Sequence, residues 1–354
     1  MPRVETVTPS SFAELAGFLA GFPDEDRSGA FWLERFHLWW EKNPAFDGRT
    51  DRGWVLRDNA RLVGFFGCVP ALFQLHGEPA TVFSGTTWRV EEPHRGSSLA
   101  LLGKLIAATR GSVLFATSPI PLVIRILKTL KFRDLPWYGS SRSIYVADPV
   151  SALRPRLDRL PAPGALAQLG APGLRGLQAW RTREIDRGAL RVESVERADA
   201  SFDALWERRR SRFSNATVRS AEVLNWYCYG HSQIRKTLLA CHDGGKLVGF
   251  AICRKDRVAV PSSLRCLDLW IDRDAGAALP ALIAGMRDEA RRLDCALVIV
   301  PHFSAKLARD LEGLGLFQSN VAGVARLFRA EPATMDRMLA ESCYLTDLEG
   351  DYGL

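Results

Sequence analysis

The chain of 354 residues contains the same series of sequence features twice, the second copy about 180 residues after the first. Each copy begins with an aromatic-rich helical stretch, at 31–40 and at 223–229. A strand-turn-strand pattern follows, in which Arg61-Leu-Val-Gly-Phe matches Lys246-Leu-Val-Gly-Phe. A strand, a helix and a further strand come next in both copies. The repeat therefore predicts two domains of the same fold, each large enough to bury a core of its own.

The repeat places one domain at 1–147 and the other at 193–330, with a connector at 148–192 and a tail at 331–354. Because five prolines interrupt regular structure in the connector, it is predicted to contain some helix but few backbone hydrogen bonds. Its leucines, Trp180 and arginines either pack across the two domains or form a basic amphipathic surface for peripheral contact with a membrane or an acidic partner. These arginines are Arg154, Arg156, Arg159, Arg175, Arg181 and Arg183.

Another shared element is a helix start that follows a strand in each copy. Its pattern is R-x-x-G-x-A, complete in the second copy, whereas Ser98 takes the glycine position in the first. Backbone N–H groups at such a helix start, aided by the helix dipole, bind a pyrophosphate. The candidate cofactor-binding residues are Arg273, Asp274, Ala275, Gly276, Ala277 and Ala278 in the second copy, and Arg95, Gly96, Ser97 and Ser98 in the first.

This motif, set between two strands and downstream of a hairpin, resembles the coenzyme A motif of the GCN5-related N-acetyltransferase (GNAT) superfamily. The resemblance covers both copies and implies an α/β fold of two tandem acyl-CoA N-acyltransferase domains, each a mixed, mostly antiparallel sheet flanked by helices. It also implies a cleft for the pantetheine of acetyl-CoA or another acyl-CoA, between 265–271 and 297–302. A counterpart would lie between 88–91 and 113–117. Because the motif is complete only in the second copy, that copy is expected to bind the cofactor, and the first copy would instead shape the acceptor site at the domain interface.

Transfer of an acyl group to an amine requires a base and an oxyanion donor. The candidate catalytic residues are Asp268 on the fourth strand of the second copy, Glu91 at the matching place in the first, beside Glu92, and His302 after the fifth strand. Cys266 shares a face of its strand with Asp268, but the carboxylate is the preferred catalyst because no activating cation lies on that face.

Leucines stand where many members of the superfamily have a tyrosine that protonates the departing thiolate. They are Leu127 in the first copy and Leu311 in the second. The tail, with Tyr344 and Asp347, either folds back to supply an acid or is disordered.

The remaining composition excludes several classes of protein. Seven cysteines without C-x-x-C spacing are typical of reduced thiols, so we expect a cytoplasmic protein, and no metal site is predicted. No signal peptide and no apolar window of about 18 residues is found, so a membrane-spanning or secreted chain is not expected. The net charge of +7 comes without an aromatic-basic motif, so nucleic acid is not an expected partner.

The leading hypothesis is an acyl-CoA-dependent N-acyltransferase that transfers groups other than aminoacyl groups. The tandem form is similar to acyltransferases of bacterial polysaccharide and cell-envelope gene clusters, which suggests an amino sugar or a cell-envelope precursor as the amine acceptor. Two alternatives stay open. The missing tyrosines favour a non-catalytic binding protein of GNAT fold, and the basic charge alone supports an aminoacyl transferase of the peptidoglycan type.

Overall fold

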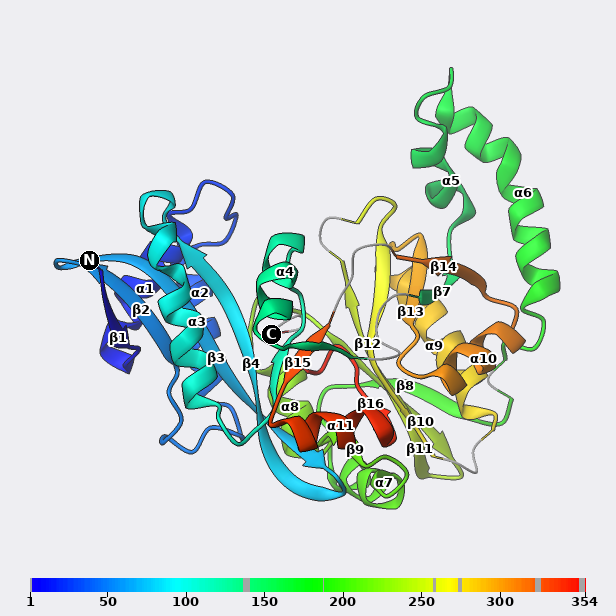
Figure 1. Ribbon diagram of the computed structural model, residues 1–354. Coiled ribbons are helices and arrows are strands. Elements are labelled where there is room, and N and C mark those ends of the chain that lie inside the picture. Colours follow the sequence, from blue (N-terminus) through cyan, green and yellow to red (C-terminus); the bar gives the residue numbers. More distant parts are fainter. Residues whose placement is uncertain are drawn as a thin grey trace.

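The computed structural model describes residues 2–135, 141–186, 188–256, 259–272, 276–321, 326–349 and 354. Two twisted sheets lie side by side, and helices cover their faces (Figure 1). Each sheet is mostly antiparallel with a parallel pair at its centre. The expected α/β architecture is therefore confirmed. No helix in the described ranges combines the length and the apolar character needed to span a membrane.

The first sheet has the strand order β1-β2-β3-β4-β5-β15-β6, and β3 also pairs with β9, which in turn pairs with β16. The hairpin of β2 and β3 is the one that the sequence predicts. The strands are β1 (Arg3–Thr6), β2 (Gly53–Asp58), β3 (Arg61–Leu75), β4 (Glu78–Val90), β5 (Leu114–Ala116), β6 (Arg133–Asp134), β9 (Asn215–Thr217), β15 (Leu327–Arg329) and β16 (Cys343–Tyr344). The helices of this half are α1 (Phe12–Ala20), α2 (Gly29–Phe36), α3 (Ser98–Ala108) and α4 (Pro121–Thr129).

The second sheet has the strand order β14-β7-β13-β12-β11-β10-β8. Its predicted hairpin is formed by β10 and β11. The strands are β7 (Ser141–Val146), β8 (Arg191–Val195), β10 (Thr237–Asp243), β11 (Lys246–Lys255), β12 (Ser263–Ile271), β13 (Leu297–Pro301) and β14 (Phe317–Asn320). The helices of this half are α7 (Ala200–Arg210), α8 (Ala221–Tyr229), α9 (Ala278–Arg292) and α10 (Ala305–Gly313), whereas α11 (Pro332–Ala340) packs against strands of the first sheet.

The two repeats exchange a strand. β7 belongs to the first repeat by sequence, but it lies between β13 and β14 of the second sheet, with Tyr145 opposite Val298. Reciprocally, β15 comes from the second repeat and lies between β5 and β6, with Phe328 opposite Phe115. The sequence boundaries at 147 and 193 therefore do not separate the two sheets.

The repeats also share a core. One buried apolar cluster contains Trp40 and Phe65 of the first repeat together with Phe250 and Leu282 of the second. The indole N–H of Trp226 in α8 donates to the carbonyl of Leu38, at 2.7 Å. The expectation of two separate cores is therefore wrong, because packing of the aromatic helices joins them.

The connector is more regular than its prolines suggest. It forms a hairpin of α5 (Pro149–Leu157) and α6 (Pro163–Arg181), which projects from the body of the molecule (Figure 1). Pro149 and Pro163 occupy helix N-terminal positions, where no backbone N–H is needed, and the Asp148 carboxylate caps α5. The expected scarcity of backbone hydrogen bonds in this segment is wrong.

Because each sheet contains a strand of the other repeat, cutting the connector should not separate the halves. We expect a variant with a site-specific protease sequence inserted in 158–162, the turn between α5 and α6, to elute after cleavage as one species of unchanged size. The two fragments should separate only in denaturant. Elution of two folded fragments of half the size would show that the exchanged strands contribute little to the association.

Candidate functional site

Both sheets contain a pair of central parallel strands that diverge. β4 and β5 pair at Phe83–Leu114 and Ser84–Phe115 and then separate. β12 and β13 pair over three positions, the last of which is Arg265–Ile299. Just beyond each pairing, the register against the preceding strand shifts by one residue, a β-bulge at 87–88 in β4 and at 267 in β12. The two repeats thus have the same cleft and the same bulge.

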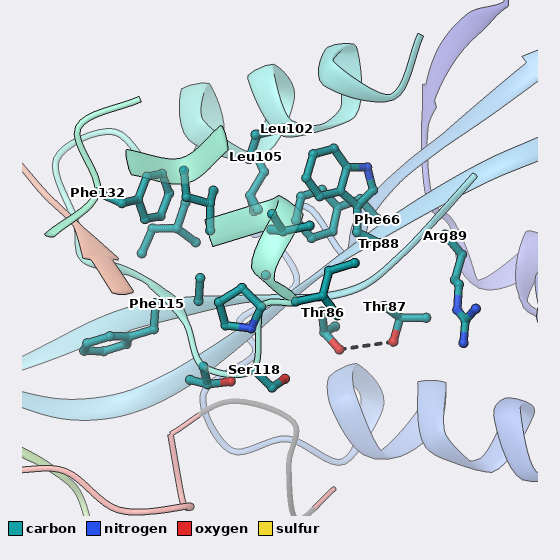
Figure 2. Close-up of a pocket in the computed structure, with 18 of the residues that line it drawn as sticks. Phe66, Thr86, Thr87, Trp88, Arg89, Leu102, Leu105, Phe115, Ser118 and Phe132 are labelled. Carbon is teal, nitrogen blue, oxygen red and sulfur yellow. Dashed lines mark hydrogen bonds between the residues drawn. The ribbon is translucent and has the colours of Figure 1, made fainter. Parts of the chain in front are cut away.

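The cleft of the first repeat is open. It holds a cavity of about 440 Å³, lined mainly by apolar side chains of β4, β5, α3 and α4. Among these are Leu102 and Leu105 on α3 and Phe132 after α4, while Phe66 and Trp88 stack at one end with ring centroids 5.0 Å apart (Figure 2). The volume falls in the range of small-molecule sites.

The bulge beside this cavity is strained. Thr87 has φ +51°, a backbone conformation that a β-branched residue rarely adopts. Its hydroxyl lies 3.2 Å from the hydroxyl of Thr86 (Figure 2). Such a conformation costs on the order of 1–3 kcal/mol and is found mostly at functional sites, where it fixes the direction of backbone groups.

Both motif helices begin without a side-chain cap. Within the described residues, the N-cap side chain makes no capping hydrogen bond at α3, whose N-cap is Ser97, or at α9, whose N-cap is Ala277. By contrast, serines cap α2, α8 and α10. At both starts the helix dipole favours an anion, although α3 continues from a 3-10 helix (Glu92–Ser97) and the Ser98 N–H already donates to the Arg95 carbonyl.

The predicted motif residues differ in their exposure to solvent. Gly96 and Gly276 are both exposed, and a Cβ on either would meet no atom within 4 Å. Ser98 is the first residue of α3, and Ala278 is fully buried at the start of α9. Arg95 is exposed and lies 3.5 Å from Glu92. Arg273, Asp274 and Ala275 lie outside the described residues.

The tail lies along the cleft of the second repeat. The backbone N–H of Asp347 donates to the carbonyl of Leu267, the bulge residue, at 2.9 Å. The hydroxyl of Tyr344 donates to the carbonyl of Leu269, and its ring contacts Trp270 of β12 and Phe303 just after β13. Chain atoms therefore occupy the strand edge along which the pantetheine was expected, and for residues 331–349 the possibility of a disordered tail is wrong.

Buried charges hold the tail in this position. The Asp347 carboxylate accepts from Arg265 at 2.8 Å and from Arg326 at 2.7 Å. Glu349 accepts from the hydroxyl of Thr217 at 2.6 Å, and the hydroxyl of Tyr227 donates to the carbonyl of Asp347 at 3.1 Å. Removing Asp347 would leave Arg326 buried without this carboxylate partner, which is strongly unfavourable inside a protein.

Asp268 lies in the same buried region. Its two carboxylate oxygens accept from Nε and Nη2 of Arg219, at 2.9 and 3.1 Å, and both residues are inaccessible to solvent. A carboxylate held in this way is a structural ion pair, which is a poor arrangement for deprotonating an incoming amine. Cys266 is also fully buried, and burial raises the pKa of its thiol well above the usual value, so it is no nucleophile either.

The other candidate catalytic residues lie apart from the hollows. Glu91 forms a bidentate pair with Arg61, at 2.7 and 2.8 Å. His302 lies beside β7, where its ring contacts the Ser143 hydroxyl at 2.9 Å, and burial lowers its pKa. Neither residue lines the cavity or the groove described next. Leu127 lines the cavity, and Leu311 is buried in α10.

A groove of about 1340 Å³ runs between the two repeats and meets the cavity. Thr87, Arg89 and Ser118 line both hollows, so the junction lies at the bulge of β4. Figure 2 shows Ser118 and Thr87 at this end of the cavity, with Arg89 beyond them. This junction could not be predicted from the sequence, because Thr87, Ser118 and the bulge of β4 have no distinctive sequence pattern.

The groove is basic. Among the residues that line it are Arg27, Arg35, Arg235, Lys236, Arg254 and Arg292. Lys236 has an enclosed ammonium group that donates to the carbonyl of Tyr227 and lies 4.4 Å from the centre of the Tyr227 ring. Burial, with a smaller contribution from the charges of Arg254 and Arg35, lowers the pKa of Lys236 to about 7.

Comparisons with known proteins bear on the fold. No family model matches the sequence, and no curated protein sequence matches it significantly. Solved structures do match. A GCN5-related N-acetyltransferase from Kribbella flavida has a TM-score of 0.58 at 14% identity, over 93% of this chain and 71% of that one.

Two further structures are similar over most of this chain. A probable N-acyltransferase of unknown function from Enterococcus faecalis V583 has a TM-score of 0.60 at 12% identity, over 93% of this chain and 72% of that chain. Saccharomyces cerevisiae N-myristoyltransferase with bound myristoyl-CoA has a TM-score of 0.55 at 15% identity, over 94% and 84% respectively. The chain therefore has the fold of the GCN5-related N-acetyltransferase superfamily, in a tandem form.

If Asp268 is a structural residue, its loss should destabilise the fold. We expect Asp268→Asn to lower the free energy of unfolding by about 3–5 kcal/mol, because Arg219 would stay buried with its charge uncompensated. Asp336→Asn is the matched control, since Asp336 pairs with Arg133 at 2.5 Å but both are exposed, and it should cost less than about 1 kcal/mol. Equal denaturant midpoints for wild type and Asp268→Asn would contradict the structural role.

The low pKa of Lys236 predicts a pH-dependent stability. Between about pH 7 and pH 10.5, Lys236 is protonated in the unfolded chain but neutral in the folded chain. The wild type therefore gains stability as the pH rises through this window. Lys236→Met should therefore be more stable than wild type at pH 6, with an advantage that shrinks toward pH 10. The exposed Lys246→Met is the control. Urea unfolding at several pH values tests this, and parallel curves for wild type and Lys236→Met would contradict it.

Proposed function

We propose that the chain is an acyl-CoA-dependent N-acyltransferase that binds its acyl-CoA in the cleft of the first repeat and its amine acceptor in the groove between the repeats. The observation that carries the proposal is the open cavity between β4 and β5, which joins the groove at the bulge. Assignment to the first repeat departs from the expectation based on the motif alone. The reason is that the tail lies along the equivalent strand edge of the second repeat.

The cofactor would lie across three features of the first repeat. Its pyrophosphate would lie at the start of α3, near Gly96, Ser97 and Ser98, where the helix dipole favours negative charge. Its pantetheine would lie in the apolar cavity, next to the strand edge of β4 that β5 leaves free. The helix dipole would thus hold the pyrophosphate and the backbone of β4 would hold the pantetheine. Neither interaction needs a particular side chain.

The reaction would take place at the junction of cavity and groove. Backbone N–H groups at the strained bulge around Thr87 would stabilise the negative charge that develops on the thioester oxygen. The groove would hold the amine in line with the thioester carbon, so that the nitrogen–carbon bond forms as the carbon–sulfur bond breaks. The proton of the amine would pass to water in the groove, and the departing coenzyme A thiolate would take up a proton from water and leave as the free thiol.

A matched pair of glycine substitutions tests which repeat binds the cofactor. Gly96→Glu places a carboxylate at the start of α3, where it should repel the pyrophosphate and weaken coenzyme A binding at least tenfold, about 1.4 kcal/mol. Gly276→Glu does the same at α9 and should leave affinity unchanged. Both side chains have open space, and acidic residues near a helix N-terminus do not destabilise it.

Calorimetric titration with coenzyme A measures both variants. A loss confined to Gly276→Glu would move the cofactor to the second repeat. Failure of the wild type to bind acetyl-CoA, longer acyl-CoAs and coenzyme A itself would overturn the proposed function in favour of a protein that kept the fold without the chemistry.

A further inference from the structure

The α5–α6 hairpin is firmly attached to the body of the protein. The side-chain amide of Gln178 is buried and bonds both backbone groups of Val146 in β7, at 2.7 and 2.6 Å. Ala167 and Ala171 of α6 are buried, and Gly170 lies so close to α5 that a Cβ would meet the Leu153 side chain at 3.3 Å. One face of α6 therefore has its partner, and the hairpin has a fixed orientation.

The opposite face of α6 has large apolar side chains in solvent. Leu169 is 79% exposed, Trp180 70%, Leu177 47% and Leu166 37%. Because positions 166, 169, 177 and 180 are separated by three, eight and three residues, they form a single stripe along the helix. Leu160, in the turn before α6, is 49% exposed. Isolated exposed leucines are ordinary, whereas a stripe along the length of a projecting hairpin is typical of an interaction surface.

The α5–α6 hairpin is strongly basic. Between positions 149 and 183 the sequence contains six arginines and one acidic residue, Asp158. All six arginines are exposed: Arg154, Arg156, Arg159, Arg175, Arg181 and Arg183. An arginine-rich helical segment with leucines and a tryptophan on its outer face is complementary to a surface in which anionic groups cover an apolar layer.

We propose that the α5–α6 hairpin docks the protein on anionic lipid membranes. The leucine stripe and Trp180 would enter the boundary between headgroups and acyl chains, and the arginines would contact the phosphates. This attachment is peripheral, since no described helix can span a bilayer. A second copy of the chain would cover the apolar stripe with a hairpin of the same charge, which is unfavourable, and an acidic protein partner would leave the chain unbound to vesicles in the test below.

Flotation with lipid vesicles tests the proposal independently of coenzyme A. The full chain should float with vesicles that contain one third phosphatidylglycerol and much less with pure phosphatidylcholine, and salt should weaken the binding. The double variant Leu169→Ser, Trp180→Ser should lose binding at least tenfold, with its unfolding midpoint unchanged because both side chains are exposed. Leu339→Ser, an apolar residue exposed on α11, is the control and should bind like the wild type.

Three results would overturn the proposal. The first is a wild type that stays with the soluble fraction in the presence of anionic vesicles. The second is a double variant that floats as well as the wild type. The third is a lipid-free dimer in sedimentation velocity that the double variant abolishes, because the stripe would then be an interface between copies of the chain.

Discussion

The reciprocal exchange of β7 and β15 is the constraint on which the arrangement of this protein depends. Each exchanged strand occupies an interior position, so each pairs on both sides within the sheet of the other repeat. Backbone pairing of this kind leaves little freedom for one sheet to move against the other, since any hinge would break a row of ladder hydrogen bonds. The groove between the repeats and its junction with the cavity thereby keep a fixed geometry, which catalysis by alignment requires.

The tail makes two similar repeats unequal. Both have a diverging strand pair, a bulge and a helix start without a side-chain cap from its N-cap residue, the features on which the proposed coenzyme A site rests. In one of them the residues around Asp347 take the backbone acceptors of the bulge region, and the cost of burying their charges is offset by Arg265 and Arg326. Asp268, although it lies on the motif strand, belongs to this buried network through Arg219.

Much of the fold could be predicted from the sequence, because the repeat and the hairpin patterns are local. The pairs β2–β3 and β10–β11 and the two motif helices all lie where periodicity and turn residues place them. The strand exchange could not be predicted, because the apolar pattern of a strand is the same in either sheet. The polar tail is typical of an exposed terminus, and its arginine partners come from distant segments that only the folded chain brings together.

The candidate site was predicted less well for a related reason. The R-x-x-G-x-A pattern concerns only the part of the proposed site that contacts the pyrophosphate. Gly276 matches the glycine position of this pattern in the second repeat, whereas Ser98 takes that position in the first. Whether the cleft between the two parallel strands is open depends on segments distant in sequence, such as the tail around Asp347 in the second repeat. The charged residues favoured on chemical grounds, Asp268 and Glu91, each lie against an arginine that was not adjacent in sequence.

The exchanged strands also set the order in which the molecule can be completed during synthesis. β15 begins at Leu327, so the first sheet lacks an interior strand until about 190 residues after β6 have been synthesised, and β5 and β6 are exposed edges until then. β7, in contrast, emerges long before its neighbours β13 and β14. A chain released early would leave both sheets unfinished, so incomplete products expose unpaired strand edges and are substrates for chaperones or proteases.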